Sequence, residues 1–452
     1  MLRKNMICRI EITDLNNLGY GVGKVDGLVV FVAGAVDGDI LDAHIIKVNK
    51  TYAVARIDTL LVPSRHRIED ACPSQGCGGC AYGNIRYAHE LELKESYVRH
   101  AFRKAGMRNV TVHPVLSTGG LTHYRNKAQY PVATDKNGRL SAGFYAPRSH
   151  RVVAAARCRL QPRVFGDIVK SVLALFEAYG LSAYDEKSHT GLLRHIYLRQ
   201  NADGSEILLT LVVNGQSLPF AEEITARLHA AYPALVGIVL NVNEEQTNVI
   251  CGDDYRLLSG RDYITDTLCG VRLKITPPAF YQVNRDAAEL LYGKARELAA
   301  IKDADTVLDL YCGIGSIGLA VAGKNCRLYG VEIVEDAVAC ARENAAANGF
   351  ENATFICADA ANIAASIPSD LAPDVIILDP PRGGCDKSTL DFVSELNPSR
   401  IVYVSSNPDT LARDCEYLRR VCHYKLGEVY PVDLFPRTGH VESVVCLTRQ
   451  TN

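Results

Sequence analysis

Apolar and polar positions alternate with a period of two over much of the first 60 residues. Leu28–Val32 is a short apolar run, and Ile40–Val48 alternates apolar with polar residues. The segment before Leu28 contains turn residues, with glycines at positions 19, 21, 23 and 27. Short strands separated by glycine turns are typical of small sheets. We therefore predict an OB-like β-barrel over residues 1–60.

A different pattern begins at Val271, where strand-like apolar runs alternate with helical segments such as Asp336–Asn348. This alternation is typical of a doubly wound α/β domain with a parallel sheet. We predict a Rossmann-like domain over residues 269–452, with strands at Thr306–Leu310, Leu328–Val331, Thr354–Cys357, Val375–Leu378 and Arg400–Val404.

The region between these two parts, residues 61–268, has a mixed pattern. Helical periodicity is present near Ala88–Lys104 and Val164–Tyr179, and strand-like runs fill most of the chain from residue 110 to 265. We predict a central mixed β domain here. The fold class is therefore a multidomain combination of β and α/β parts.

Length and composition are those of an ordinary globular protein. The 452 residues suffice for about two to four domains, and 48% of them are hydrophobic and 22% charged. The sequence has no apolar run long enough to cross a bilayer, and Met1–Met6 leads into strand-like sequence without a signal-peptide core. We expect a cytoplasmic, monomeric protein with no membrane partner.

Charge is distributed unevenly along the chain. From Tyr97 to Arg163 there are 13 Lys and Arg residues and one acidic residue, Asp135. This segment has a net charge of +12, whereas the rest of the chain has −14. A solvated basic face would explain the pattern. A polyanion-binding surface explains it better, because each neutralised phosphate releases counterions.

The sequence DLYCGIGSIG (309–318) follows an apolar strand and precedes a helix. Glycines at such a junction let the backbone turn tightly and approach a ligand at a helix N-terminus. Glu332 ends the next strand, 19 residues after Gly313, where an acid can accept hydrogen bonds from ribose hydroxyls. Dinucleotide-binding proteins use the same device, so the glycines alone leave NAD open as an alternative.

Acidic residues at further strand ends favour S-adenosylmethionine over NAD. Asp309 ends its strand at the place where methyltransferases hold the methionine part of this cofactor. Asp359 follows the third strand, a usual place to meet adenine, and Asp379 opens a DPPR motif (379–382) near the transferred methyl group. Structural glycines alone do not explain acids at four successive strand ends.

Five motifs resemble the RNA uracil-5-methyltransferase family in order and spacing: FYQVN (280–284), DLYCGIGSIGL (309–319), DPPRGG (379–384), SSNPDTLARD (405–414) and PRTGHVES (436–443). HYRNKAQYPV (123–132), GFYAPRSHRVV (143–153) and GLLRHIYLR (191–199) support the resemblance in the middle region. GYGVGKVDGLVVFVAGAVDGD (19–39) resembles the TRAM domain, an RNA-binding module. The chain resembles the ribosomal-RNA branch of this family, which has an iron–sulfur cluster.

This resemblance implies methylation of uridine carbon 5 in 23S ribosomal RNA, with a tRNA uridine as the alternative substrate. In that reaction a thiolate adds to uracil C6, C5 takes the methyl group, and a base removes the C5 proton. By similarity, Glu442 is the base, Asp379 bonds the edge of uracil, and Gln282 orients the uracil or the cofactor. We expect cofactor contacts from Gln282, Asp309, Tyr311, Gly313, Gly315, Glu332, Asp359 and Asp379, and RNA contacts from Arg125, Lys127, Arg148, Arg194 and Phe280.

The chain departs from the family at the nucleophile. The family motif is S-C-N-P, and this chain has Ser406 where the thiol should be. A cysteine thiol has a pKa of about 8.5 and is partly ionised at neutral pH, whereas a serine nucleophile needs a dedicated base. Cys415, nine residues further on, is predicted to be a packing residue of the next helix. We expect the chain as written to be slow or inactive; an engineered knockout, a natural inactive homologue and an altered mechanism all remain open.

Cys72, Cys77 and Cys80 form a C-x4-C-x2-C pattern, and Cys158 is the expected fourth ligand. Closely spaced thiolates with glycines between them suit an iron–sulfur cluster, whereas zinc sites prefer paired C-x2-C motifs. We therefore favour an iron–sulfur cluster, [4Fe–4S] by resemblance, with zinc as the alternative. The first loop is one residue shorter than the family pattern, which leaves the cluster type open.

Overall fold

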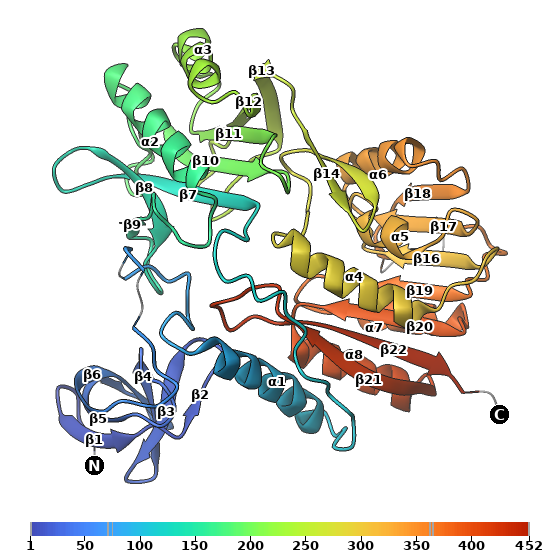
Figure 1. Ribbon diagram of the computed structural model, residues 1–452, viewed down its shortest axis with the longest axis horizontal. Helices are drawn as coiled ribbons and strands as arrows, with labels where there is room; N and C mark the ends of the chain where they lie inside the picture. The colour runs from blue at the N-terminus through green and yellow to red at the C-terminus, as the bar shows by residue number, and fades with distance from the viewer. Residues whose placement is uncertain (1, 70–71, 75, 361–362, 364–365, 451–452) are drawn as a thin grey trace.

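The computed structural model describes residues 2–69, 72–74, 76–360, 363 and 366–450. Figure 1 shows an N-terminal sheet (blue), a central sheet covered by helices (green) and a layered C-terminal domain (yellow to red). In the described part of the chain, every helix is too short or too polar to cross a membrane.

The N-terminal sheet buries one face of its strands, because apolar residues alternate with polar ones. Its strands are β1 (Ile7–Glu11), β2 (Asp14–Leu15), β3 (Tyr20–Val25), β4 (Leu28–Ala33), β5 (Ile40–Val48) and β6 (Tyr52–Val62). Their order is β1-β5-β6-β4-β3-β2, with β4 parallel to β6 and the other pairs antiparallel. β1 also contacts β3, so the sheet curves on itself around Val30, Leu41 and Ala53.

The central sheet has the order β13-β12-β11-β10-β7-β8-β9. Helices α2 (Arg163–Ala178) and α3 (Ala221–Ala231) share one buried core with it, in which Phe165 and Phe176 pack with Leu198 and Leu211. The strands are β7 (Lys127–Thr134), β8 (Leu140–Tyr145), β9 (Val152–Ala154), β10 (Leu193–Gln200), β11 (Ile207–Val213), β12 (Leu235–Val242) and β13 (Asp254–Gly260).

The C-terminal domain begins with a hairpin of β14 (Ile264–Leu268) and β15 (Val271–Ile275). Its main sheet comprises β16 (Thr306–Leu310), β17 (Arg327–Glu332), β18 (Ala353–Cys357), β19 (Val375–Leu378), β20 (Arg400–Ser405), β21 (Tyr424–Val432) and β22 (Glu442–Arg449). The order is β18-β17-β16-β19-β20-β22-β21, and β16 to β20 are parallel. The strand order reverses beside β16, which is where such sheets form a ligand crevice.

Helices cover both faces of this main sheet (Figure 1). On one face, α4 (Arg285–Ala299), α5 (Ser316–Val321) and α6 (Glu335–Ala347) pack into a common core. On the other, α7 (Lys387–Glu395) and α8 (Pro408–Arg420) are joined by α1 (Tyr87–Lys104), a helix from far earlier in the chain.

Helix α1 and the segment after it pack against the C-terminal domain. Val98 and Phe102 of α1 share a buried core with Leu411 of α8. The chain then runs beside β21, where Val112 pairs with Val429, and Leu116 with Val432. The sequence pattern had placed this segment in the middle region, residues 61–268, but residues 87–116 complete one face and one edge of the C-terminal sheet.

The predicted elements of the C-terminal domain are present in the structure. Thr306–Leu310 and Val375–Leu378 coincide with β16 and β19, and the predicted helix Asp336–Asn348 overlaps α6. Helix α3 was not predicted. Phe220 stands at its N-cap position without a capping side-chain hydrogen bond, so the usual polar start signal is missing.

Candidate active site

A cavity of about 630 Å³ lies at the carboxyl ends of the parallel strands. One predicted residue comes from each strand end: Tyr311 after β16, Glu332 from β17, Asp359 after β18, Asp379 after β19 and Ser406 after β20. The other predicted residues that line the cavity are Phe280, Gln282, Gly313 and Glu442. The structure thus brings nine of the predicted cofactor, catalytic and RNA residues together.

Asp309 and Gly315 are not among the described residues that line this cavity. Gly315 has a φ of 80°, a left-handed conformation that glycine adopts at little cost. A Cβ at Gly318 would lie 2.5 Å from Asp309 Oδ2, so only glycine lets α5 approach the end of β16 this closely. Gly318 N donates to Asp309 Oδ2 at 3.0 Å. Asp309 is 0% exposed and therefore holds the glycine loop (309–318) in place through this buried hydrogen bond.

Glu332 connects the glycine loop to the second strand. Its Oε2 accepts a hydrogen bond from Gly313 N at 3.0 Å. Its Oε1 accepts from Ile333 N at 2.9 Å and from Val334 N at 3.0 Å. These three backbone donors fix the carboxylate at the cavity wall, in the position from which an acid can bind ribose hydroxyls.

Two carboxyl groups in the cavity have pKa values near neutrality. Burial raises the pKa of Asp379 to about 7. Burial, and then the nearby Asp379, raises the pKa of Glu442 to about 8, while Arg382 opposes this shift. Carboxyl groups that exchange protons near the working pH are candidates for general acid–base catalysis.

The ladder between β20 and β22 ends beside position 406. Ser405 pairs with Ser443 in this antiparallel ladder, so Ser406 follows the last paired residue of β20 and Glu442 precedes its partner in β22. Ser406 and Glu442 both line the cavity.

The turn after β20 is fixed to the DPPR loop. Asn407 Oδ1 accepts from Asp409 N at 3.1 Å and caps α8, and Asn407 Nδ2 donates to Arg382 O at 2.9 Å. Thr410 Oγ1 donates to the same carbonyl at 3.2 Å. Ser406 is thus carried by a turn whose position relative to Asp379 is set by several hydrogen bonds.

No cysteine is present among the described residues that line the cavity. Cys415 lies in α8 and is fully buried, and burial raises the pKa of its thiol well above the usual value. Cys385, at the end of the DPPRGG loop, is also buried, and burial raises its pKa to about 12. Burial therefore keeps both thiols protonated at neutral pH, and neither of them lines the cavity.

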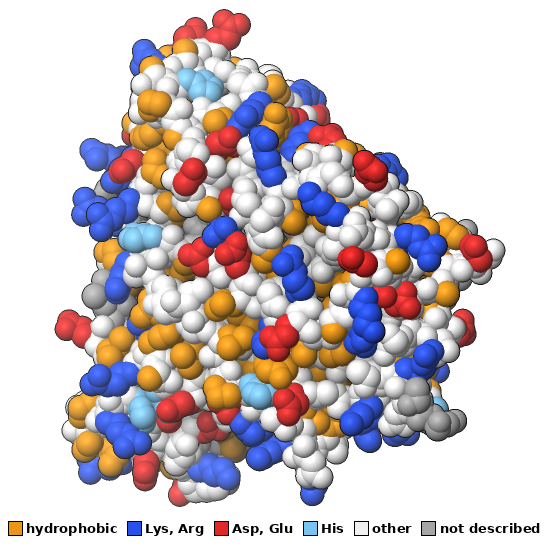
Figure 2. All heavy atoms as spheres, turned by 45° about the vertical axis from the view of Figure 1, so that its right-hand side comes forward, with side chains coloured by type: hydrophobic (Ala, Val, Ile, Leu, Met, Phe, Trp, Pro, Cys, Tyr) orange, Lys and Arg blue, Asp and Glu red, His pale blue; other side chains and the backbone are white. Residues whose placement is uncertain are grey.

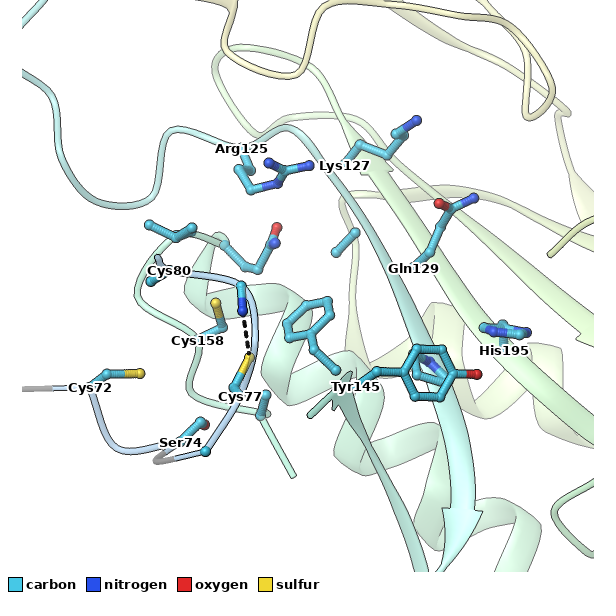
Figure 3. Close-up of a pocket in the computed structure, with 18 of the residues that line it drawn as sticks. Cys72, Ser74, Cys77, Cys80, Arg125, Lys127, Gln129, Tyr145, Cys158 and His195 are labelled. Carbon is cyan, nitrogen blue, oxygen red and sulfur yellow. Dashed lines mark hydrogen bonds between the residues drawn. The ribbon is translucent and has the colours of Figure 1, made fainter. Parts of the chain in front are cut away.

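The four predicted metal-ligating cysteines line a second cavity of about 380 Å³, in the central region. The sulfur atoms of Cys72, Cys77 and Cys158 point toward a common space, with Cys80 beside it (Figure 3). Burial raises the pKa of Cys77 and of Cys158. Gly79 N donates to Cys77 Sγ at 3.4 Å, the kind of backbone contact that stabilises a thiolate.

The residue set suits a metal centre. All four cysteines are described and line one cavity. Four thiolates are ligands that both iron–sulfur clusters and zinc accept.

The residues predicted to contact RNA are distributed over several surfaces. Arg125 and Lys127 line the cysteine cavity (Figure 3), where burial lowers the pKa of Lys127 to about 8. Arg148 lies over the ring of Tyr20, 5.0 Å from its centroid, and so links the central region to the N-terminal sheet. Phe280 is 62% exposed at the catalytic cavity.

Arg194 has a different environment from the other predicted RNA contacts. It is 5% exposed, and its guanidinium donates to the backbone carbonyls of Asn243 at 2.6 Å and Glu245 at 2.8 Å. Its donors are therefore used within the central domain, away from the catalytic cavity. Figure 2 shows basic and acidic side chains interspersed on one face of the molecule, so the basic segment does not form a single uniform patch in that view.

Sequence reasoning missed several residues that line this cavity, among them Arg382 and Phe435. Arg382 belongs to the DPPR motif, and Phe435 directly precedes PRTGHVES. The motifs themselves could have indicated both residues, because one lies within a matched motif and the other directly beside one.

Comparisons with known proteins agree along the whole chain. A family model described as tRNA (Uracil-5-)-methyltransferase matches residues 217–450, and a TRAM domain model matches residues 4–57. An uncharacterised RNA methyltransferase of Halalkalibacterium halodurans is 39% identical over 452 residues, which cover 99% of this chain and 98% of that protein. One of Clostridium tetani is 38% identical, with coverage of 99% and 97%.

A solved structure resembles the whole molecule. It is the Pyrococcus abyssi tRNA (uracil-54, C5)-methyltransferase in complex with S-adenosyl-L-homocysteine. The TM-score is 0.78 at 25% sequence identity, and the match covers 98% of this chain and 100% of that one.

Proposed function

Since the chain belongs to the tRNA (uracil-5-)-methyltransferase family and carries a TRAM domain, we propose that it is built to methylate carbon 5 of uridine in RNA. One observation carries the proposal: Ser406, Glu442 and Asp379 line the same cavity, with Ser406 directly after the last pair of the β20–β22 ladder. This is the arrangement that a nucleophile, a base and a substrate-binding carboxyl require for methylation at C5.

The wall of the cavity supplies the residues for the methyl donor. Gly313, Glu332 and Asp359 lie at three neighbouring strand ends, with Tyr311 and Gln282 beside them. S-adenosylmethionine, when bound there, supplies an electrophilic methyl group and a positive charge that favours the ionised forms of nearby carboxyl groups. Asp309 contributes indirectly, because it holds the glycine loop through Gly318 N.

The remaining residues act on uracil. A nucleophile at position 406 adds to C6 and makes C5 electron-rich, so that C5 takes the methyl group. Glu442 then removes the C5 proton, and elimination at C6 releases the nucleophile. Asp379 bonds the edge of the base, and Phe280, exposed at the cavity, offers a stacking surface for a nucleotide lifted out of its helix.

Ser406 makes this chain slow or inactive in the reaction for which it is built. A serine hydroxyl is a much weaker acid than a thiol and requires a base of its own. The buried thiols of Cys385 and Cys415 do not replace it. This single residue favours a second candidate function, that of an RNA-binding protein that retains the scaffold without catalysis.

We propose 23S ribosomal RNA as the substrate class, with tRNA as the alternative that the printed names of the family model and of the Pyrococcus abyssi enzyme suggest. A metal cluster held by the four cysteines beside the basic segment would favour a folded RNA substrate that the protein contacts at several surfaces. Cys72, Cys77, Cys80 and Cys158 would hold an iron–sulfur cluster that joins the 72–80 loop to the central sheet.

The test is nucleoside mass spectrometry on unmodified 23S RNA and unmodified tRNA after incubation with S-adenosylmethionine. The protein as written is compared with Ser406→Cys and with Ser406→Ala, which sets the background. We expect 5-methyluridine from Ser406→Cys alone. Equal product from the unchanged protein would refute the argument about the serine.

A second variant distinguishes loss of proton removal by residue 442 from loss of the whole active-site structure. In Ser406→Cys combined with Glu442→Gln, the adduct forms but its C5 proton is not removed. We expect a protein–RNA adduct that survives denaturing electrophoresis. If Ser406→Cys makes no product on either RNA and the double variant makes no adduct, the methyltransferase proposal fails and the RNA-binding function is favoured.

A further inference from the structure

Two histidines and an aspartate meet where the N-terminal sheet contacts α1, apart from the catalytic cavity. Asp37 lies in the turn before β5, His66 in the linker after β6, and His89 in the first turn of α1. Within the described ranges, this is the one group of three or more His, Cys, Asp or Glu residues whose ligand atoms all lie within 4.8 Å of one another.

His89 is held between two carboxylates. Its Nε2 lies 2.8 and 2.9 Å from the two carboxylate oxygens of Asp37, and its Nδ1 lies 2.7 Å from Glu92 Oε2. The rings of His66 and His89 are stacked, with centroids 3.7 Å apart and an angle of 19° between their planes. Three chain segments are therefore joined through one imidazole.

This arrangement requires a positive charge at the centre of the cluster. Glu92 accepts the Nδ1 proton of His89, which leaves the Nε2 lone pair directed at Asp37, a second acceptor. Either Nε2 carries an additional proton or a cation lies between them. Metal-bound histidines characteristically donate the distal N–H to a carboxylate, and the Glu92–His89 pair has this form.

We propose that Asp37, His66 and His89 bind a divalent zinc-type cation. Two imidazoles and one carboxylate, with water in the fourth position, are ligands that zinc accepts in tetrahedral geometry. The cysteine cavity offers sulfur ligands and is a separate site. The bound ion would join the N-terminal sheet, the linker and α1 at one point.

The surroundings permit such an ion. The side chains of His89 and Asp37 are 11% and 20% exposed, so the site is largely shielded from solvent. Arg65 Nε lies 3.0 Å from His66 Nε2, and because the Arg65 side chain is exposed, it would give up this contact to solvent when the cation binds.

Cobalt(II) and zinc binding to the full-length protein test the site. Zinc equivalents are measured by calorimetry and by elemental analysis, and cobalt spectra distinguish nitrogen and oxygen ligation from thiolate ligation. The variants are His89→Ala and the milder Asp37→Asn. His113→Ala is the matched control, because His113 Nε2 also lies 2.7 Å from a glutamate, Glu428, and its ring is stacked on Tyr430.

Beyond any metal that the four cysteines hold, we expect the wild type and His113→Ala to bind one further equivalent of zinc, and of cobalt with a spectrum free of thiolate charge transfer. His89→Ala should lose this equivalent, and Asp37→Asn should bind it at least about tenfold more weakly, since removal of a ligand or its partner costs about that much. A wild type whose zinc is bound only by thiolates overturns the proposal, whether or not the variants fold. Equal nitrogen-ligated zinc in the wild type and in folded His89→Ala overturns it as well.

Discussion

Replacing Lys94 by methionine would remove the cation that two buried carboxyl groups share, and Glu90 would keep only Arg437 Nη1, which lies 3.6 Å from its Oε2. Lys94 is 1% exposed, and its ammonium group donates to Glu90 Oε1 at 2.8 Å, Asp433 Oδ1 at 2.7 Å and Phe435 O at 3.1 Å. An ammonium has three N–H donors, and each of them is used here. Both carboxyl groups are 0% exposed, so water does not replace the lost partner.

The expected cost follows from this burial. Removing one partner from a buried ion pair destabilises a protein by about 3–5 kcal/mol, because the remaining charge is left uncompensated. In a domain of roughly 150–250 residues, 1 kcal/mol shifts the melting temperature by about 2–4 °C. We therefore expect Lys94→Met to lower the melting temperature of the C-terminal domain by about 6–20 °C.

Scanning calorimetry of the full-length protein measures this shift. Lys104→Met is the matched control on the same helix, because Lys104 pairs with Asp409 at 3.4 Å while the two side chains are 70% and 45% exposed. An exposed pair contributes about 0–1 kcal/mol. If Lys94→Met lowers the melting temperature no more than Lys104→Met does, the buried ion pairs do not stabilise the contact between α1 and the segment before Glu442. Adding Glu90→Gln and Asp433→Asn to Lys94→Met should recover part of the loss, because the orphaned charges are then removed.

Two further predictions concern Glu442 and the cysteine cavity. Burial raises the pKa of Glu442 from 4.5 to about 8, so the folded protein keeps a proton that the unfolded chain releases, and this contribution to stability is lost as the pH rises from 4.5 through about 8. In urea titrations between about pH 5 and about pH 8, the wild type should lose up to about 1.4 kcal/mol more per pH unit than Glu442→Gln, and equal slopes would contradict the assigned pKa. Cys158→Ser should reduce the iron and sulfide content of anaerobically purified protein, while Cys415→Ser, which changes a buried cysteine of α8, should not; unchanged iron in Cys158→Ser would exclude it as a ligand.

The sequence was sufficient to bring most of the predicted cofactor residues to one cavity, because several of them end strands. Apolar runs marked β16 to β19, and the acids that follow them, such as Glu332 and Asp379, come together at one edge of a parallel sheet by topology alone. Asp309 was predicted by the same reasoning and stays a prediction. Its hydrogen bond to Gly318 N and the close approach of that glycine are contacts that strand periodicity does not encode.

Contacts between distant segments could not be predicted from the sequence pattern. Lysine and glutamate four residues apart on a helix usually indicate a solvated face, yet Lys94 and Glu90 of α1 are buried against the C-terminal domain. A Cβ at Gly439 would lie 1.7 Å from Asn17 O, so the loop before Glu442 also packs directly on the N-terminal sheet. Nothing periodic relates positions 17, 94 and 439, and each contact depends on how the three parts of the chain assemble.

A serine at position 406 requires a proton transfer that this cavity does not favour. The hydroxyl must lose its proton when it adds to uracil C6, and C5 must then lose a second proton before elimination. Glu442 lines the same cavity as Ser406 and has a pKa of about 8, and the pKa of Asp379 is about 7, so both are weak bases toward an alcohol. A cysteine thiol, with a pKa of about 8.5, is matched to these carboxyl groups and transfers its proton at little cost. The electrostatics of the cavity thus favour a thiol nucleophile, which is why Ser406→Cys, and not a change at the base, is expected to restore methylation.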